Sequence, residues 1–406
     1  MKLKIIKGPI KKNINVPTSK SWANRYLILA AISKQEILIK NIPLSTDVIQ
    51  LISALKKIGI KIQQKNNDIV ILNSFPECEH DTESETITIN TSDGGTTNRF
   101  LLSLLTRGGK NYVIKASPNF IKRPKDEIVK TLINYGINVE IGTNDVWLKV
   151  NGGCKINSDV LNISCQHSTQ FISGLTLAYA DTDIKFEPVS LKSSEKYYDM
   201  TKNAVTDFKK GTDTFIVPVD FSSLSYPIAF SIGFSELHFP NCFSKDELQA
   251  DSYFLDFLQT KGVVFDFNQN GLTVNSSAFD YEPFELSCSG YPDLVPSLVF
   301  LACLCNGTST LKDLKVLTYK ESNRFLEIIN VLKFANVKYF HDSQKFILNI
   351  HGPYEKSISG NINLPPDHRI IMLATMLLRK FGSGTINQVE HVKKSYPNFF
   401  DDFLIN

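Results

Sequence analysis

A recurring pattern of short apolar segments limits the fold of this chain more than any other feature. Six segments are apolar nearly all round, which is typical of helices buried on every side. They are residues 22–32, 99–106, 170–179, 225–232, 295–305 and 370–378. Polar residues mark their N-terminal ends, namely Lys20, Thr96, Ser168, Ser222, Asp293 and Asp367. Successive markers are 76, 72, 54, 71 and 74 residues apart. Four near-equal steps indicate six copies of one structural unit, and the short third step predicts where the chain leaves one domain for another.

Amphipathic segments of a second type lie between the apolar ones. Residues 127–135 precede Gly136, and residues 253–261 precede Gly262. An alternating apolar stretch follows each of these glycines, which is typical of a helix C-cap that leads into a sheet strand. The sequence therefore predicts an α/β (α+β) chain, and its 406 residues suffice for two domains. The alternative is a generic α/β chain whose regular spacing arose by chance.

Charge and cysteine content exclude several classes of protein. The formal net charge is +3, from 44 basic and 41 acidic residues, so no general nucleic-acid role is expected and an anion site must be built locally. The seven cysteines are scattered, with no CxxC pair, as in a protein that keeps reduced thiols. No signal peptide and no run of about 18 apolar residues is visible, which predicts a cytoplasmic protein without membrane contact.

The six apolar segments begin with polar, chemically rich residues. Unpaired amides and the positive end of the helix dipole make a helix start a site for anions. The starts are Thr18-Ser-Lys-Ser21, Asp93-Gly-Gly-Thr-Thr97, His167-Ser-Thr-Gln170, Asp220-Phe-Ser-Ser223, Tyr291-Pro-Asp293 and Asp367-His-Arg369. The alternative is that Ser, Thr and Asp here are plain N-caps, and for Asp220, Ser222 and Ser223 the two interpretations are equally favoured.

Basic residues accompany these helix starts. Each one alone is more often a solvated surface charge. Their coincidence at positions related by the repeat favours a phosphate- and carboxylate-binding role instead, because Arg binds such groups bidentately and Lys supplies a point charge. The residues are Lys20, Arg25, Arg123, Lys320, Arg324, Arg369 and Lys394.

At this point the motifs resemble those of the 5-enolpyruvylshikimate-3-phosphate synthases, members of the enolpyruvyl transferase family. Ser19-Lys-Ser-Trp-Ala-Asn-Arg25 resembles their SKSxxNR motif, and Asp93-Gly-Gly-Thr-Thr-Asn-Arg99 resembles their Gly-containing loop. Further matches follow in family order over about residues 17 to 400. They are Lys122-Arg-Pro, Ser168-Thr-Gln170, Tyr197-Tyr-Asp-Met-Thr201, Tyr291-Pro-Asp293, Lys320-Glu-Ser-Asn-Arg324, Asp367-His-Arg369 and Lys394-Ser-Tyr-Pro397.

The resemblance implies a fold and a reaction. The fold would be two domains, each of three βαβαββ units around buried helices, with the active site in the cleft between them. One domain would be discontinuous, residues 1–18 plus 219–406, and the other would be residues 19–218. The reaction would transfer the enolpyruvyl group of phosphoenolpyruvate to the 5-hydroxyl of shikimate 3-phosphate, in the route to chorismate and aromatic amino acids. The protein would be a monomer without cofactor or metal, inhibited by glyphosate at the phosphoenolpyruvate site.

The resemblance also assigns residues to roles. Asp293 would take the hydroxyl proton, Glu321 would handle the methylene proton, and Lys20 would contact both substrates. The residues that would bind shikimate 3-phosphate are Lys20, Ser21, Arg25, Ser168, Thr169, Gln170, Ser194, Tyr197, Asp293 and Lys320. The residues that would bind phosphoenolpyruvate are Lys20, Gly95, Arg123, Gln170, Arg324, Arg369 and Lys394.

Departures from the family pattern leave alternatives open. The unusual residues are Thr18, Gly94, Lys196, Val316 and Asn323, and none of them is an expected catalytic residue. One alternative is the sister family that transfers the same group to a UDP-linked amino sugar. Another is a non-catalytic binding protein on the same scaffold, since a fold alone does not establish activity.

Overall fold

The computed structural model describes residues 1–76, 86–153, 155–191, 194–233 and 236–404. Its contacts divide the chain into two compact units. We call Met1–Pro17 with Val219–Asn406 the discontinuous unit, and Thr18–Pro218 the inserted unit. Thr18 thus falls in the inserted unit rather than at the end of the first segment. Cys78 and Cys154, two of the predicted thiols, lie outside the described residues.

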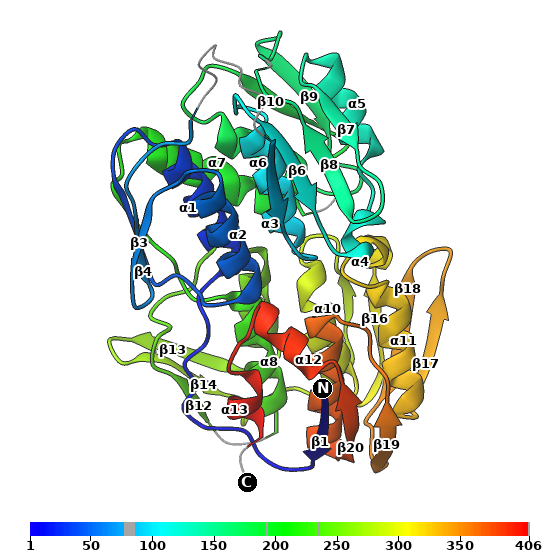
Figure 1. Cartoon of the computed structure of the whole chain (residues 1–406). Coiled ribbons are helices and arrows are strands. Elements are labelled where there is room, and N and C mark those ends of the chain that lie inside the picture. Colours follow the sequence, from blue (N-terminus) through cyan, green and yellow to red (C-terminus); the bar gives the residue numbers. More distant parts are fainter. Residues whose placement is uncertain (77–85, 154, 192–193, 234–235, 405–406) are drawn as a thin grey trace. The chain divides into compact units, whose positions relative to one another are not determined.

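Three buried helices form the centre of the inserted unit (Figure 1). They are α1 (Lys20–Ile32), α3 (Gly95–Leu105) and α6 (Gln170–Ala178), and each contacts the other two. Their side chains are buried almost all round because apolar residues occupy every face. These are the first three predicted helices, with α3 starting four residues earlier than expected.

Small sheets cover these helices, and the pairing pattern repeats. In order, the strands are β11 (Thr214–Ile216), β2 (Ile37–Lys40), β4 (Asp68–Ile71) and β3 (Ile62–Lys65) in one sheet; β5 (Thr86–Asn90), β6 (Asn111–Lys115), β8 (Val146–Val150) and β7 (Val139–Ile141) in a second; and β9 (Val160–Ser164) with β10 (Lys185–Val189). In each four-stranded sheet the first pair is parallel and the other pairs are antiparallel. The other helices of the unit are α2 (Thr46–Lys57), α4 (Pro118–Ile121), α5 (Asp126–Asn134) and α7 (Glu195–Lys209).

The discontinuous unit has the same construction. Its buried helices are α8 (Phe221–Ser231), α10 (Val295–Ala302) and α12 (His368–Phe381). Its sheets are β15 (Glu285–Ser287), β16 (Gly307–Lys312), β18 (Ile347–Gly352) and β17 (Lys338–Asp342); β12 (Leu237–Phe239), β14 (Gly271–Asn275) and β13 (Val264–Asn268); and β1 (Lys2–Ile6), β20 (Gly382–Asn387) and β19 (Ile358–Ile362). The remaining helices are α9 (Tyr253–Thr260), α11 (Arg324–Phe334) and α13 (Phe399–Phe403), with 3-10 turns η1 (Ala250–Ser252), η2 (Pro292–Leu294), η3 (Leu314–Tyr319) and η4 (Val389–Lys394). The first of these sheets repeats the strand order and pairing of the four-stranded sheets in the inserted unit. Six related helices thus support the predicted repeat.

Residues with a left-handed backbone follow the C-termini of α5 and α11, and after α5 this residue is the predicted Gly136. Gly136 adopts φ +92° after α5, and a Cβ there would lie 2.9 Å from the carbonyl oxygen of Lys155, so the position needs a residue without a side chain. After α11 the left-handed residue is Asn336, at φ 55°, one residue past Ala335. Asparagine tolerates this conformation better than most residues.

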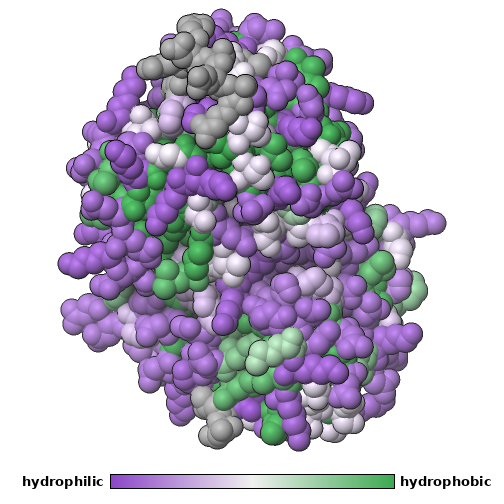
Figure 2. Space-filling model, viewed as in Figure 1, coloured by the Kyte–Doolittle hydropathy of each residue, from purple (hydrophilic) through white to green (hydrophobic). Residues whose placement is uncertain are grey.

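The surface is mixed in polarity, in keeping with the balanced composition. On the face drawn in Figure 2, hydrophilic side chains predominate and apolar ones lie between them. No helix in the described ranges has the length and apolar character needed to cross a membrane.

Candidate active site

Asp293 lies at the centre of a cluster of cations in the discontinuous unit. It belongs to η2, which leads into the buried helix α10. Its Oδ1 accepts a hydrogen bond from Arg324 Nη1 at 2.8 Å, and its Oδ2 accepts one from Arg369 Nη2 at 3.0 Å. Lys320 Nζ lies 3.6 Å from Oδ1. Burial lowers the pKa of Lys320, although the charge of Asp293 opposes this. The structure therefore brings three predicted site residues together around the Asp293 carboxylate.

Glu321 occupies a neighbouring position with cations of its own. Its Oε1 lies 3.1 Å from Lys394 Nζ and 3.8 Å from Arg324 Nη2, and its Oε2 lies 2.9 Å from His368 Nδ1. Burial tends to raise the pKa of Glu321, but His368, Lys394 and Arg324 together hold it well below its usual range. Glu321 is therefore an ionised carboxylate in this arrangement.

Asp367 holds Arg324 between the two carboxylates. It is fully buried at the N-cap of α12, where its Oδ1 accepts a hydrogen bond from Arg369 N at 3.0 Å. Its Oδ2 accepts a hydrogen bond from Arg324 Nε at 2.8 Å and another from Ser322 Oγ at 3.0 Å. Asp367 therefore both caps its helix and orients a predicted binding residue.

The ligand atoms of Glu321, Asp367 and His368 lie within 4.8 Å of one another, close enough for a metal ion. Arg324 and Lys394 already contact the two carboxylates at ion-pair distances. A divalent cation would add to positive charge that is already there. Because Arg324 and Lys394 already neutralise the two carboxylates, the cluster attracts a metal ion only weakly.

Asp251 is a buried carboxyl that the sequence motifs did not single out. It accepts a hydrogen bond from Ser222 Oγ. Burial, followed by the charge of Asp293, raises the pKa of Asp251 to about 7. The Ser222 hydroxyl thus donates to Asp251 and not to its own helix. Asp220 is the N-cap of α8 and accepts from Ser223 N at 2.8 Å. The N-cap interpretation holds for Asp220.

Arg25 organises one part of the inserted unit. It lies one turn into α1, is 3% exposed, and contacts the ring of Phe100. Its guanidinium donates to Thr201 Oγ1 at 2.9 Å, to the Ser21 carbonyl at 2.8 Å and to the Tyr197 carbonyl at 2.6 Å. Burial lowers the pKa of Arg25 to about 10. Three predicted substrate-binding residues, Ser21, Arg25 and Tyr197, are thus joined by one guanidinium.

A second cluster surrounds Gly95, the first residue of α3. Arg99 Nη1 donates to Gln170 Oε1 at 2.5 Å, and Gln170 Nε2 donates to Thr96 Oγ1 at 2.9 Å. A Cβ on Gly95 would lie 3.0 Å from Gln170 Oε1, 3.2 Å from Arg123 Nη1 and 3.3 Å from Arg99 Nη1. Burial, and then the charge of Arg123, lower the pKa of Arg99 to about 9. Two guanidinium groups therefore meet beside a glycine at a helix start, where an anion is favoured.

Lys20 begins α1 and makes an ion pair that the motifs did not predict. Its Nζ lies 3.0 Å from Oδ2 of Asp47, a buried residue in the first turn of α2.

Most of the predicted binding cations are buried, so the alternative of solvated surface charges is wrong for them. They are Arg25, Arg123, Arg324, Arg369 and Lys394.

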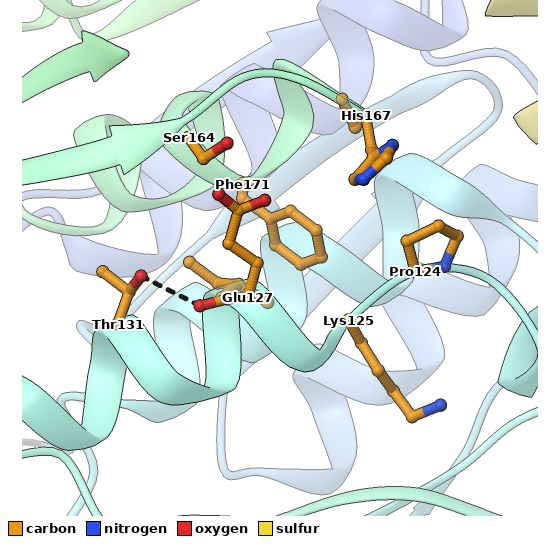
Figure 3. A pocket seen from close by; sticks show the side chains of 9 residues that line it. Pro124, Lys125, Glu127, Thr131, Ser164, His167 and Phe171 are labelled. Atoms are coloured by element: carbon orange, nitrogen blue, oxygen red, sulfur yellow. Dashed lines mark hydrogen bonds between the residues drawn. The ribbon is translucent and has the colours of Figure 1, made fainter. Parts of the chain in front are cut away.

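A pocket lies next to the start of α6, within the inserted unit (Figure 3). It encloses about 340 Å³ of empty volume, part of it open to solvent. Figure 3 shows Glu127 and Thr131 of α5 on one side, with Phe171 and His167 across from them. Its lining also includes Ser168, whose Oγ accepts from Gln170 N at 3.2 Å. The predicted residue Ser168 thus combines helix capping with an accessible position.

Thr169 and Ser194 are less integrated than the other predicted residues. Thr169 is buried at the N-cap of α6 and makes no capping hydrogen bond with its side chain. Ser194 precedes α7 with a left-handed backbone, φ 59°, and its hydroxyl does not cap that helix. Within the described residues, no hydrogen bond therefore links either hydroxyl to the cluster around Arg25 or to the cluster around Gly95.

Three of the five departures have a local explanation. Thr18 Oγ1 donates to the Asn41 carbonyl at 2.6 Å, and Asn323 caps α11 by accepting from Leu326 N at 3.3 Å. A Cβ on Gly94 would lie 2.9 Å from Asp47 Oδ1, so the carboxylate occupies the space that a side chain at this position would need. Val316 lies in η3, and nothing in the structure explains it or Lys196.

Asp47 and Asp251 lie outside every motif that the sequence matched, and Arg99 ends the matched Asp93–Arg99 loop but was given no role there. Arg99 follows Gly95 by one helical turn, so its i,i+4 spacing from the glycine loop was an available signal. Asp47 lies 27 residues from Lys20 outside any matched motif, and no sequence pattern linked the two.

Comparisons with known proteins agree over the whole chain. The family model described as EPSP synthase (3-phosphoshikimate 1-carboxyvinyltransferase) matches residues 5–403. A 3-phosphoshikimate 1-carboxyvinyltransferase from Clostridium beijerinckii is 28% identical, over 99% of this chain and 96% of the relative. One from Methanosarcina acetivorans is 26% identical, over 99% and 97%.

Solved structures show the same fold. An EPSP synthase from Acinetobacter baumannii superposes with a TM-score of 0.74 and 18% identity, covering 98% of this chain and 97% of that structure. The enolpyruvyl transferase NikO from Streptomyces tendae gives a TM-score of 0.71 and 12% identity, with 98% and 96% covered. At these identities the likeness concerns the fold alone.

Proposed function

The chain belongs to the EPSP synthase family, and from this membership we propose that it transfers the enolpyruvyl group of phosphoenolpyruvate to the 5-hydroxyl of shikimate 3-phosphate, releasing phosphate. The observation that carries the proposal is a pair of carboxylates, Asp293 and Glu321, each held by several cations. Acid–base chemistry on an anionic substrate needs proton-transferring groups inside a positively charged site.

Asp293 is proposed to take the proton of the attacking hydroxyl. Its oxygens are oriented by Arg324 and Arg369, so the carboxylate has a fixed direction. As the hydroxyl oxygen forms its bond to C2 of the enol phosphate, the proton passes to Asp293. The two arginines and Lys320 remain to balance the negative charge of the tetrahedral adduct.

Glu321 is proposed to exchange the proton at the methylene carbon. In the described arrangement His368, Lys394 and Arg324 lower the pKa of Glu321 and favour its ionised form. Binding of phosphoenolpyruvate would draw Lys394 and Arg324 toward the substrate's phosphate and carboxylate, so the pKa of Glu321 would rise. Glu321 would then take a proton from solvent and give it to the methylene carbon as the hydroxyl oxygen attacks C2. After the addition step, Glu321 takes a proton back from the methyl group as the bond to phosphate breaks.

The inserted unit is proposed to supply the remaining anion contacts. Arg99 and Arg123 meet at Gly95, and a bound phosphate or carboxylate would offset their burial and mutual repulsion. Gln170 is oriented by Arg99 and Thr96 to donate or accept beside them. The cluster of Ser21, Arg25 and Tyr197, with Ser168, Thr169 and Ser194, is proposed to bind shikimate 3-phosphate.

Phosphate release tests the proposed function. Purified protein should release phosphate only when phosphoenolpyruvate and shikimate 3-phosphate are both present. A parallel assay with UDP-N-acetylglucosamine should give no release. Equal turnover with the UDP sugar, or no release with either acceptor, would overturn the assignment.

Location and assembly complete the proposal. We propose a cytoplasmic monomer that needs no cofactor. The described cysteines, Cys165, Cys242, Cys288, Cys303 and Cys305, are buried free thiols, which suits a reducing compartment. Light scattering on the purified chain tests the monomer, because a dimer would double the mass.

A further inference from the structure

We propose that the carboxylate of Asp47, seated in the space left by Gly94, is a positioning residue that fixes the ammonium group of Lys20 for the reaction. The inference rests on the proposed function, in which Lys20 contacts both substrates. Asp47 has no other role in the proposed function, and its contact with Gly94 accounts for the unusual glycine.

Asp47 is directed at Lys20 rather than at its own helix. Its Oδ2 lies 3.0 Å from Lys20 Nζ, and the residue is 1% exposed. An acidic residue in a first helical turn often serves only to offset the helix dipole. Here α2 has no side-chain capping bond at Ser45, and within the described ranges Oδ1 of Asp47 is buried and accepts no hydrogen bond. The Lys20 ammonium is therefore the contact that defines where this carboxylate lies.

The backbone on either side of the carboxylate is fixed. Thr97 Oγ1 donates to the Asp47 carbonyl at 2.9 Å, which ties the start of α2 to the start of α3. The Gly94 carbonyl accepts from Asn98 N at 3.0 Å and from Asn98 Nδ2 at 2.9 Å. Neither backbone segment can move away without losing these bonds.

Gly94 faces the carboxylate at contact distance. A Cβ at this position would lie 2.9 Å from Asp47 Oδ1, 3.0 Å from Asp47 Cγ and 3.0 Å from Thr97 Oγ1. A Cβ is essentially never found closer than 3.0 Å to such a neighbour, so an added methyl forces a shift. Because hydrogen bonds hold both backbone segments, we expect the end of the Asp47 side chain to move. Since Asp has a short side chain, that displacement would move Oδ2 away from Lys20.

A fixed carboxylate matters because lysine is flexible. Its ammonium ends a flexible four-carbon stem that has many rotamers. A buried counter-ion restricts that freedom before substrate binds, which favours the chemical step more than binding. Removing the negative charge would leave Lys20 more available to anions but less well placed, so turnover should fall without a rise in KM for phosphoenolpyruvate.

The test is a double-mutant cycle on the full chain, read by phosphate release with phosphoenolpyruvate and shikimate 3-phosphate. Asp47→Asn should lower kcat about tenfold, with KM for phosphoenolpyruvate unchanged or lower. In a Lys20→Ala background, Asp47→Asn should leave kcat nearly unchanged. Gly94→Ala should also lower kcat, and Gly94→Ala with Asp47→Asn should be no worse than the more impaired single variant.

Matched variants serve as controls. Asp145→Asn removes an exposed carboxylate that also lies 3.0 Å from a lysine, Lys115, and should leave kcat unchanged. Gly290→Ala adds a methyl that meets nothing within 4 Å, and should behave as wild type. Thermal unfolding identifies any variant that is misfolded, and Asp47→Ser, a helix-start residue without charge, then takes the place of Asp47→Asn.

Two results would overturn the inference. One is an equal loss for Asp47→Asn with and without Lys20, which would indicate a structural role. The other is wild-type turnover in Gly94→Ala. Calorimetric titration with phosphoenolpyruvate gives a second readout that needs no turnover, since the effect of Asp47→Asn on binding should vanish in the Lys20→Ala background. An inactive wild type would reject the proposed function. The titration would still test the inference in that case, because an effect of Asp47→Asn on phosphoenolpyruvate binding that remains in the Lys20→Ala background would reject it.

Discussion

Gly95→Ala is the substitution that most directly examines the anion site of the inserted unit. The added methyl would lie 3.0 Å from Gln170 Oε1, 3.2 Å from Arg123 Nη1 and 3.3 Å from Arg99 Nη1. All three contacts are tighter than ordinary van der Waals distance, so the neighbours must move by a few tenths of an ångström. Gln170 cannot swing away freely, because Arg99 holds its oxygen at 2.5 Å and Thr96 holds its nitrogen at 2.9 Å.

The magnitude follows from what this movement disturbs. Weakening one hydrogen bond in the cluster costs about 1.4 kcal/mol, and it affects any anion bound there, so KM for phosphoenolpyruvate should rise about tenfold. Glyphosate is longer than phosphoenolpyruvate and would also meet the methyl directly. Such overpacking costs about 1–3 kcal/mol, so its inhibition constant should rise about 100-fold.

The assay is phosphate release at saturating shikimate 3-phosphate, with phosphoenolpyruvate varied at several inhibitor concentrations. Wild type should show competitive inhibition. Gly290→Ala is the control, because its methyl meets nothing within 4 Å. If Gly95→Ala raises KM as much as the inhibition constant, the steric reasoning is wrong and the loop acts only on the phosphate that both ligands share.

Three further predictions concern the carboxylates and Arg25. Glu321→Gln keeps the shape but loses proton transfer, so kcat should fall about 10³-fold while binding of shikimate 3-phosphate by calorimetry stays within a few-fold of wild type; unchanged turnover would remove Glu321 from the mechanism. Arg25→Lys cannot reproduce three directed hydrogen bonds, so KM for shikimate 3-phosphate should rise about tenfold or more, and a KM equal to that of wild type would contradict the assignment. Asp251 has a folded-state pKa raised to about 7, so its contribution to stability is present at acid pH and is lost as pH rises from the unfolded value toward 7. The free energy of unfolding of Asp251→Asn should therefore exceed that of wild type by an amount that grows between about pH 5 and 8, to on the order of 1–3 kcal/mol. A difference that does not change with pH would refute the raised pKa.

Much of the fold is encoded locally. The six buried helices could be predicted because each is apolar on all faces, which no surface helix can be. Their ends follow from short-range chemistry, such as Asp220 capping α8 and Gly136 adopting a positive φ after α5. The order of Asp293, Glu321 and Arg324 along the chain also suggested the roles proposed for them, through motifs of a few residues each.

Contacts between distant segments were decided only by the tertiary structure. Arg99 and Gln170 are 71 residues apart, and Lys20 and Asp47 are 27 apart. Each pair meets because two helix starts pack side by side, and no local pattern records which neighbour a side chain will face. The ionised state of Glu321 has the same origin, since it depends on Lys394 and His368 from two other segments. Residue types and short-range caps are written in the sequence, whereas distances between charges arise only when packing fixes the helices that carry them.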